Sequence, residues 1–375
     1  MPAKKKKGVS IDEDTLIALK KKGVSNTLLD CRLEYAEAST LLNNFIAPLT
    51  KQYKVFPQFL PTQASGRWST TNPPITNFPK ECCNPQHEPL GKHRPQKGCY
   101  TPRDVVVPDP GTYWIHFDWD AIEAKLVAAF SHDKADLEAF SKGYDIHTIT
   151  ACKMWGIPLP PILTKACHTL PECEEWRGLW VPVWEGGDDR RRTIGKIARY
   201  GCNYGPNEYA ILNAKGLDEL NLSHEEALQA GRMYLDSKPN LREWKFRTWA
   251  RVLKDRQART AIGRPRRLFV AEKDVEMWIR RKMPPEVARE GLNHEVQGTV
   301  ADAMNLTIIK IVERWPQAGL CQQLHDGLVM SFPNNVKVWP EIREICEPTH
   351  KINGYPIKFT GEFERILSSG EKEHL

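Results

Sequence analysis

The sequence predicts an α+β fold with helices and a small antiparallel sheet, and three stretches of the 375 residues indicate it. From Arg192 to Tyr204 a polar or aromatic side chain recurs every fourth residue, which places these side chains on one stripe of a helix. Residues 113–117 are aromatic and β-branched, as in a strand. Residues 320–332 read as two short strands around an Asp-Gly turn, a standard hairpin signal.

Composition bounds the size of the fold and the kind of partner. A chain of this length suits two or three domains or subdomains, and 41% hydrophobic residues allow a sizeable core. The net charge of +6 permits a polyanionic partner without demonstrating one. No apolar stretch resembles a signal peptide or a membrane span, so we expect no membrane, a cytoplasmic location and reduced thiols at the ten cysteines.

The N-terminal part is basic and then helical. Residues 1–29 open with a run of four lysines and read either as an arm that touches phosphates or as a solvated tail. Apolar residues at helical spacing over 29–49 predict one helix that ends before Pro48. Residues 62–79 are rich in turn residues and carry Arg67 after a glycine.

Cysteines and histidines gather in the next stretch, residues 80–101. Their spacing is loosely compatible with a zinc site, but they do not repeat a C-x2-C pattern, and surface thiols and imidazoles are the alternative. The set consists of Cys82, Cys83, His87, His93 and Cys99.

The strand at 113–117 ends at Asp118, and a helix with Ile122, Leu126 and Phe130 on one face follows. A carboxylate at a strand end is well placed to hold a hard cation, although an aspartate that caps the following helix is the simpler explanation.

The helical stripe consists of Arg192, Lys196, Tyr200 and Tyr204 and is cationic at one end and aromatic at the other. A nucleoside triphosphate has the same polarity along its length, because guanidinium and ammonium groups suit phosphates and an aromatic ring suits a base or sugar. An exposed basic helix with two packed tyrosines is the alternative.

Two further polar groups follow. Three arginines, at 264, 266 and 267, suit phosphates or a structural ion-pair network about equally. Arg289, Asn293 and Gln297 again step by four along a helix, where amides suit the acceptors that every base pair shows in the minor groove. A polar helix face is the alternative for this second group.

Together these motifs resemble those of the family A DNA polymerases, which are related to bacterial polymerase I. The segment R-x3-K-x3-Y-x3-Y-G resembles motif B, and residues 118–123 resemble motif A and continue into Asp145-Ile-His147 as the family does. His325-Asp326-Gly327 resembles motif C, with Gly327 where the family has glutamate. Residues 62–79, 260–268 and 289–302 resemble three further family segments, whereas residues 158–189 depart from the family.

The resemblance implies a right-hand polymerase with an antiparallel-sheet palm, helical fingers and a thumb that is reduced or missing. It divides the chain into residues 1–61, a basic arm with a thumb remnant; 62–130, the first part of the palm; 131–290, the fingers; and 291–375, the second part of the palm.

The resemblance also implies roles for single residues. Asp118 and Asp326 would hold two Mg²⁺ ions, which activate the primer 3′-hydroxyl and neutralise the triphosphate. Lys196 would protonate the leaving pyrophosphate, and Glu123 would close against the sugar and exclude ribonucleotides. The nucleotide-binding set is Arg192, Lys196, Tyr200, Tyr204, Glu123 and His147. The DNA-binding set is Arg67, Arg289, Asn293, Gln297 and His325.

The implied activity is template-directed addition of deoxynucleotides to a primer 3′-hydroxyl, with primer-template DNA and dNTPs as partners. The N-terminal 61 residues have no room for an exonuclease domain, so we expect a compact, phage-type enzyme without proofreading, with a processivity partner as a candidate for the clamp. Two alternatives stay open: a single-subunit RNA polymerase, which Glu123 argues against, and a catalytically silent DNA-binding subunit.

Overall fold

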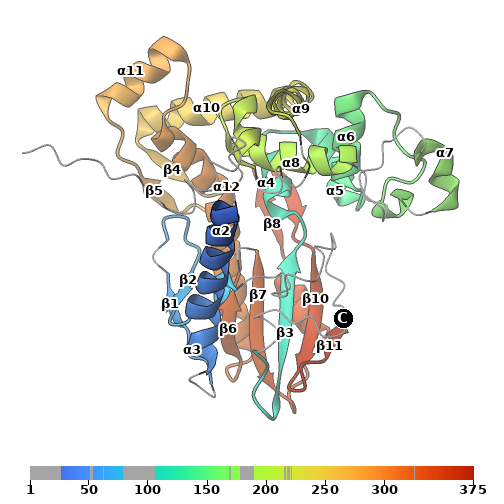
Figure 1. Ribbon diagram of the computed structural model, residues 1–375, viewed down its shortest axis with the longest axis vertical. Coiled ribbons are helices and arrows are strands. Elements are labelled where there is room, and N and C mark those ends of the chain that lie inside the picture. Colours follow the sequence, from blue (N-terminus) through green and yellow to red (C-terminus); the bar gives the residue numbers. More distant parts are fainter. Residues whose placement is uncertain are drawn as a thin grey trace, which may run out of the picture.

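The computed structural model describes residues 27–50, 54–61, 63–78, 106–168, 170–177, 190–214, 217, 220, 222–324 and 326–375. A five-stranded sheet forms one part of the molecule, and a group of helices lies over one end of that sheet (Figure 1). The zinc candidates at residues 82–99, the run of four lysines and His325 lie outside the described residues.

The central sheet is antiparallel throughout, in the order β11-β10-β3-β7-β6. Its strands are β3 (Thr112–Trp119), β6 (Gly319–Gln323), β7 (Gly327–Pro333), β10 (Gly361–Leu367) and β11 (Lys372–His374). Along β3 every second side chain is buried, so Phe117 and Trp119 enter the core while Asp118 lies on the opposite face. The predicted strand is therefore confirmed and extends over Asp118.

The long helix α12 (Glu286–Arg314) joins the sheet to the helical part. Its buried positions, among them Leu292 and Val296, share one hydrophobic core with Phe117 of β3 and Phe332 of β7. The short helix α4 (Ile122–Phe130), which follows β3 directly, packs in the same core through Ile122 and Leu126. The observed combination of helices and an antiparallel sheet confirms the α+β prediction.

The helical part consists mainly of residues 134–281. Its helices are α5 (Lys134–Ser141), α6 (Ile146–Trp155), α7 (Glu174–Arg177), α8 (Arg190–Tyr204), α9 (His224–Asp236), α10 (Pro239–Asp255) and α11 (Glu272–Arg281). Local signals fix several ends: Asp145 caps α6, Gly156 ends it in a left-handed conformation, and Ser223 and Glu226 form a capping box on α9.

The remaining elements are short. They are β1 (Gln58–Leu60), β2 (Ser69–Thr71), β4 (Gln257–Arg259), β5 (Pro265–Arg267), β8 (Thr349–Ile352), β9 (Tyr355–Lys358), α13 (Glu341–Cys346) and the 3-10 turns η2 (Ile75–Asn77), η3 (Lys165–His168), η4 (Pro171–Cys173) and η5 (Glu208–Asn213). Within the described ranges, no helix is both long and apolar enough to cross a membrane.

The N-terminal helix differs from the prediction, because it does not end before Pro48. Helix α2 (Thr27–Thr40) continues through a π-helical stretch, η1 (Leu41–Ile46), into α3 (Ala47–Thr50). The amide of Ala47 donates to the Leu42 carbonyl, the wide π-type pattern, directly before the proline that cannot donate. The π-helical stretch therefore accommodates the proline without ending the helix.

The hairpin between β6 and β7 is confirmed, but its turn is displaced from the predicted Asp-Gly pair. The Leu324 amide donates to the Gly327 carbonyl at 2.8 Å and Gly327 begins β7, so Gly327 belongs to the strand and not to the turn. Asp326 therefore directly precedes β7, and Gly327 lies beside Asp118 on the neighbouring strand.

Candidate active site

Asp118 and Asp326 meet at adjoining ends of β3 and β7. Asp118 is the cross-strand partner of Gly327, and the amide of Trp119 donates to the Asp326 carbonyl at 2.9 Å. The two aspartates thus come from segments about 200 residues apart, and the sheet brings them together. This juxtaposition is the one that the resemblance to motifs A and C implied.

A metal ion at the adjoining ends of β3 and β7 would have the carboxylates of Asp118 and Asp326 as its ligands. Across the part of the chain that the structure describes, no group of three or more His, Cys, Asp or Glu side chains is arranged to hold a metal ion. A Cβ atom at Gly327 would lie 2.9 Å from the Phe117 carbonyl and 3.1 Å from Asp118 Oδ1. Position 327 is therefore too tight for a side chain unless its neighbours move. The carboxylate oxygens of Asp118 and Asp326 are ligands of the kind that Mg²⁺ prefers.

Glu123 connects α8 to the sheet and to residues 63–68, which precede β2 and are called the Arg67 loop below. It lies in the first turn of α4, where Oε2 accepts a 2.6 Å hydrogen bond from Tyr204 and Oε1 accepts a 2.5 Å bond from Arg67. Burial, and then the Glu123 carboxylate, raise the pKa of Tyr204 well above its ordinary value, so the phenol is a neutral donor. Three predicted site residues therefore form one cluster.

The stripe on α8 is present as predicted. Its opposite face, which includes Ile194, Ile197 and Cys202, is buried, while Lys196 and Tyr200 are exposed. Partial burial of the Tyr200 hydroxyl raises its pKa, the charge of Arg199 lowers it, and the carboxylates of Glu123 and Asp326 raise it further. The aromatic end of the stripe therefore lies within electrostatic range of Glu123 and Asp326.

The cationic end of the stripe has a partner that the sequence reasoning did not assign. Asp145 accepts from Arg192 Nε at 2.7 Å and from Arg192 Nη2 at 3.1 Å, a bidentate pair. Asp145 also accepts from the His147 amide as the cap of α6. An aspartate directly before a helix was the available signal, but capping alone does not predict which cation it binds.

His147 lies beside Tyr200, with 6.0 Å between the ring centroids. Burial, together with the nearby Arg199 and Arg192, lowers the pKa of His147 to about 3. The imidazole is therefore neutral near neutral pH and can act on a phosphate only as a neutral donor.

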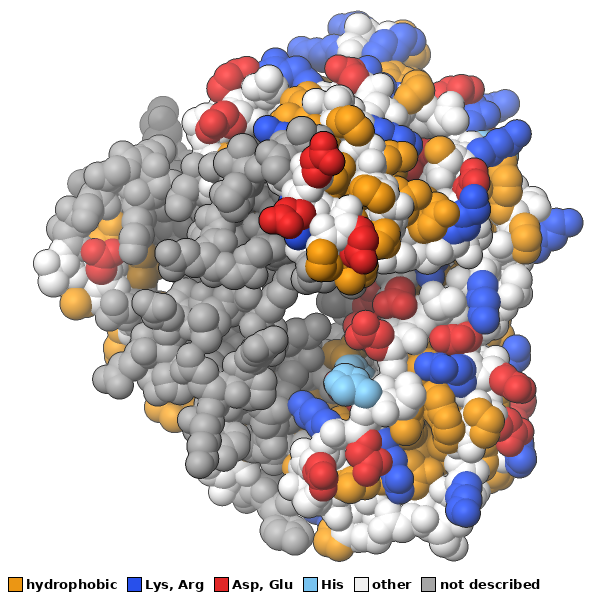
Figure 2. Space-filling model, turned by 90° about the vertical axis from the view of Figure 1, so that its right-hand side faces the viewer, with side chains coloured by type: hydrophobic (Ala, Val, Ile, Leu, Met, Phe, Trp, Pro, Cys, Tyr) orange, Lys and Arg blue, Asp and Glu red, His pale blue; other side chains and the backbone are white. Residues whose placement is uncertain are grey.

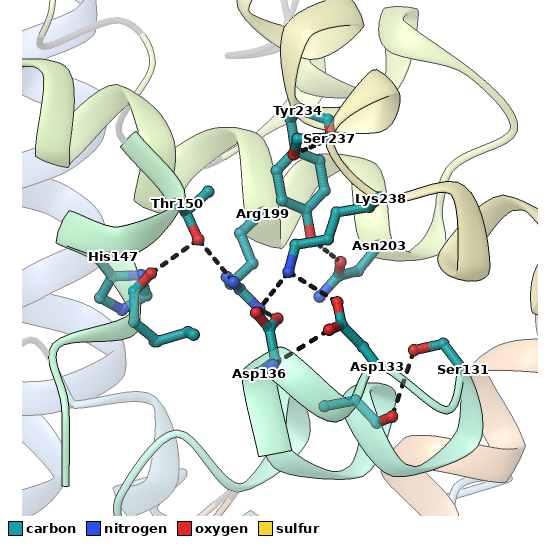
Figure 3. A network of polar contacts seen from close by, with 12 residues as sticks. Ser131, Asp133, Asp136, His147, Thr150, Arg199, Asn203, Tyr234, Ser237 and Lys238 are labelled. Atoms are coloured by element: carbon teal, nitrogen blue, oxygen red, sulfur yellow. Dashed lines mark hydrogen bonds and ion pairs between the residues drawn. The ribbon is translucent and has the colours of Figure 1, made fainter. Parts of the chain in front are cut away.

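Behind the stripe, a buried ionic network fixes α8 to its neighbours (Figure 3). Arg199 donates to Asp136 of α5 at 2.9 Å and to Thr150 of α6 at 2.6 Å. Lys238, which directly precedes α10, donates to Asp136 at 2.5 Å and to Asp133 at 2.8 Å. Two cations thus meet two carboxylates in the interior.

The Arg67 loop is anchored to α12 through Arg264. Arg264 Nη2 donates to the Ser65 carbonyl at 2.7 Å and Nε donates to Asp302 of α12 at 2.5 Å. A Cβ atom at Gly66, whose φ is +86°, would lie only 2.5 Å from Arg264, so this approach requires glycine. Arg266 pairs with Glu290, which favours the structural explanation for two of the three clustered arginines.

The second predicted stripe lies along α12. Arg289 is exposed and Asn293 and Gln297 are half-buried, whereas their neighbours Leu292, Val296 and Val300 are buried. These three side chains therefore occupy the polar edge of α12 in its N-terminal half, where most other positions are buried. They form a group separate from the carboxylates, linked to the Arg67 loop through Arg264 and Asp302.

The space-filling view shows acidic side chains on the margin between the helical part and the sheet part (Figure 2). Lys and Arg side chains lie on the same face, above and below that margin. Such a mixture suits a site that holds both cations and phosphates.

A model of DNA polymerase family A matches residues 1–166 and 180–352. DNA polymerase I of Helicobacter pylori (strain ATCC 700392 / 26695) is 28% identical over 374 residues, which cover 97% of this chain and 35% of that protein. The thermostable DNA polymerase I of Thermus aquaticus is 27% identical over 309 residues, which cover 80% of this chain and 31% of that protein.

A solved structure shares the fold. It is described as the POL domain of Pol1 from M. smegmatis in complex with DNA primer-template and dNTP, and it aligns with a TM-score of 0.64 and 22% sequence identity. The alignment covers 98% of this chain and 57% of that one. The chain spans about a third of the length of the curated relatives it matches.

Proposed function

The chain belongs to DNA polymerase family A, and from this premise we propose that it carries out template-directed DNA synthesis. In this reaction the primer 3′-hydroxyl attacks the α-phosphorus of a dNTP, a new phosphodiester bond forms and pyrophosphate leaves. The observation that carries the proposal is the meeting of Asp118 and Asp326 at adjoining strand ends, below a helix that carries a cationic and aromatic stripe.

Members of the family generally use divalent metals, and the two aspartates fit them. We assign Asp118 and Asp326 as the residues that hold two Mg²⁺ ions, because both supply hard oxygen ligands at one point of the sheet. When bound, these ions supply Lewis-acid activation of the hydroxyl and neutralisation of phosphate charge.

The stripe on α8 binds the incoming nucleotide in this proposal. Lys196 and Arg192 meet the phosphates, and Lys196 gives a proton to the departing pyrophosphate. His147, neutral because of burial, donates a hydrogen bond without adding charge. Tyr200 faces the sugar, at the aromatic end of the stripe.

Glu123 selects deoxynucleotides in this proposal. Its hydrogen bonds to Tyr204 and Arg67 hold its carboxylate at the junction of α4 and α8, where a 2′-hydroxyl would meet it. This arrangement supports DNA synthesis over RNA synthesis.

Primer-template DNA lies, in this proposal, against Arg67, Arg289, Asn293 and Gln297, with His325 at the primer terminus. Amide groups on α12 accept or donate to base-pair edges without reading sequence. We expect the protein to act in the cytoplasm, and the processivity partner stays a prediction.

A primer-extension assay tests the proposal. The wild-type protein with Mg²⁺ should extend a primer with dNTPs and discriminate against NTPs, and Asp118→Ala or Asp326→Ala should abolish extension while DNA binding persists. Asp109→Asn is the matched control, because Asp109 lies before the other end of β3 and pairs with Lys54. Extension by either alanine variant would contradict the assignment of the two carboxylates.

A further inference from the structure

Residues 167–179 are the internal stretch that the family model leaves unmatched. The described part of this stretch is folded against α6: Cys167, Cys173 and Trp176 are buried in one cluster with Ala151 and Cys152. Trp176 donates from its indole to the Pro158 carbonyl at 2.8 Å, so the segment is also fastened to the chain that precedes it. Its described part is therefore packed against α6, which in turn contacts α8 through Arg199 and Thr150.

One side chain of this segment reaches the partner of Arg192. His168 Nε2 lies 2.8 Å from the Thr148 hydroxyl, and that hydroxyl donates to Asp145 Oδ2 at 2.8 Å. A threonine hydroxyl has one proton, so if it donates to Asp145 it must accept from His168. The order of donation is therefore His168 to Thr148 to Asp145, and Asp145 in turn holds Arg192.

This chain of hydrogen bonds is enclosed. The side chain of Asp145 is 2% exposed and that of His168 is 14% exposed. The imidazole is held by the Trp176 ring, which meets it edge-on with 5.8 Å between centroids. Without a donor on its lone pair, a helical threonine hydroxyl can turn to its own backbone carbonyl one turn earlier, which would release the carboxylate.

We propose that His168 is a positioning residue for Arg192, and that the unmatched segment holds this guanidinium in place for the triphosphate of a dNTP. The inference rests on the proposed function only for the identity of the ligand. The relay itself stands on the hydrogen bonds from His168 through Thr148 and Asp145 to Arg192.

Single-nucleotide insertion kinetics test whether His168 affects dNTP binding. His168→Ala should raise the KM for dNTP about three- to tenfold, the loss expected for one hydrogen bond, and leave kcat and DNA affinity near wild type. His168→Gln retains an N–H donor and should restore the KM. Glu172→Gln changes an exposed carboxylate of the same segment and should behave as wild type.

A double-mutant cycle shows whether His168 acts through Arg192. In an Arg192→Ala background, His168→Ala should have no further effect on KM, because the side chain that it positions is gone. An unchanged KM in the single variant, or an equal rise in both backgrounds, would overturn the proposal.

A measurement that does not need activity separates the two proposals. In ¹⁵N NMR spectra the Arg192 Nε–H signal should exchange with water faster in His168→Ala than in wild type or His168→Gln. Equal exchange in all three proteins would refute the relay. A wild-type protein that fails to extend primers would refute the proposed function instead, while the exchange rates would still decide the relay.

Discussion

The Tyr200 hydroxyl distinguishes this stripe from one that carries phenylalanine at the same position. A dideoxynucleotide lacks the 3′-hydroxyl that contacts its own phosphate, and a tyrosine hydroxyl at that point can replace the lost contact. Such a contact is worth about 1 to 3 kcal/mol, so we expect Tyr200→Phe to reject chain terminators roughly ten- to a hundredfold more strongly than wild type. The dideoxy-to-deoxy incorporation ratio of both proteins measures this, and equal ratios would mean that Tyr200 does not face the sugar.

Gly327 controls the space around the Asp118 carboxylate. A Cβ atom there would lie 3.1 Å from Asp118 Oδ1 and 2.9 Å from the Phe117 carbonyl, so Gly327→Ala should displace the carboxylate. We expect kcat to fall at least about tenfold, because catalytic groups misplaced by as little as 1 Å lose much of their effect.

Gly319→Ala is the matched control for this change. Gly319 lies in the same hairpin, and the nearest atom to its added Cβ would be Ser331 Cβ at 3.7 Å, an ordinary contact. Primer-extension kinetics compare the two variants, and equal activity would mean that position 327 tolerates a side chain.

The positions of single residues in the fold agreed with the sequence where a local pattern predicted them. The four-residue repeat placed Lys196 and Tyr200 on one helix face, and the strand end placed Asp118 correctly. The partners of site residues could not be predicted in the same way. Asp145 binds Arg192 across 47 residues of sequence, and His168 contacts Thr148 across 20 residues. Such pairs depend on how the helices pack against one another, and the spacing of residues within one helix does not contain this information.

At the scale of elements, periodicity predicted β3, the hairpin and α8, while special backbone geometry was missed. Pro48 was read as a helix end, but the π-helical stretch before it lets the helix continue. The Asp-Gly pair was read as the turn, but Gly327 already belongs to β7. In both cases a residue lacks the local structure that it usually has: Pro48 does not end its helix, and Gly327 is not in the turn. Contacts elsewhere in the fold outweigh the local preference.

The buried ionic network around Asp136 and Arg199 leads to a prediction about the free energy of unfolding. Burial raises the pKa of Asp136, but Arg199 and Lys238 outweigh burial and lower it to about 2. Asp136→Asn leaves two buried cations with one carboxylate fewer, so we expect a loss of about 3 kcal/mol in the free energy of unfolding at neutral pH. Urea denaturation measures the difference.

The pH dependence of this loss has a defined sign. Because the pKa of Asp136 is lower in the folded protein than its ordinary value of 3.8, its ionised form stabilises the fold above about pH 4. That contribution disappears as the pH falls towards 2, so the gap between wild type and Asp136→Asn should narrow over this range. A constant gap from pH 5 to pH 2.5 would contradict the ionic explanation.

At the scale of the whole molecule, α12 connects the helical part with the sheet. It has 29 residues, and at 1.5 Å per residue it is about 43 Å long. Its buried positions enter the common core and its polar edge stays accessible. A helix of this length can therefore present a row of side chains along a DNA duplex while remaining fixed by the core.

Two exposed arginines on α12 separate a role in DNA binding from a general effect of charge. Arg289 lies near the N-terminal end of the polar edge, whereas Arg314 ends the helix and pairs with Glu341 at 2.5 Å. If Arg289 meets a phosphate, Arg289→Gln should weaken binding to every DNA sequence and reduce the slope of log K against log salt by about 1. Arg314→Gln removes the same charge and should leave the slope unchanged. Fluorescence anisotropy on primer-template DNA over a salt series measures both slopes, and equal slopes for the two variants would mean that the polar edge of α12 does not contact the DNA backbone at Arg289.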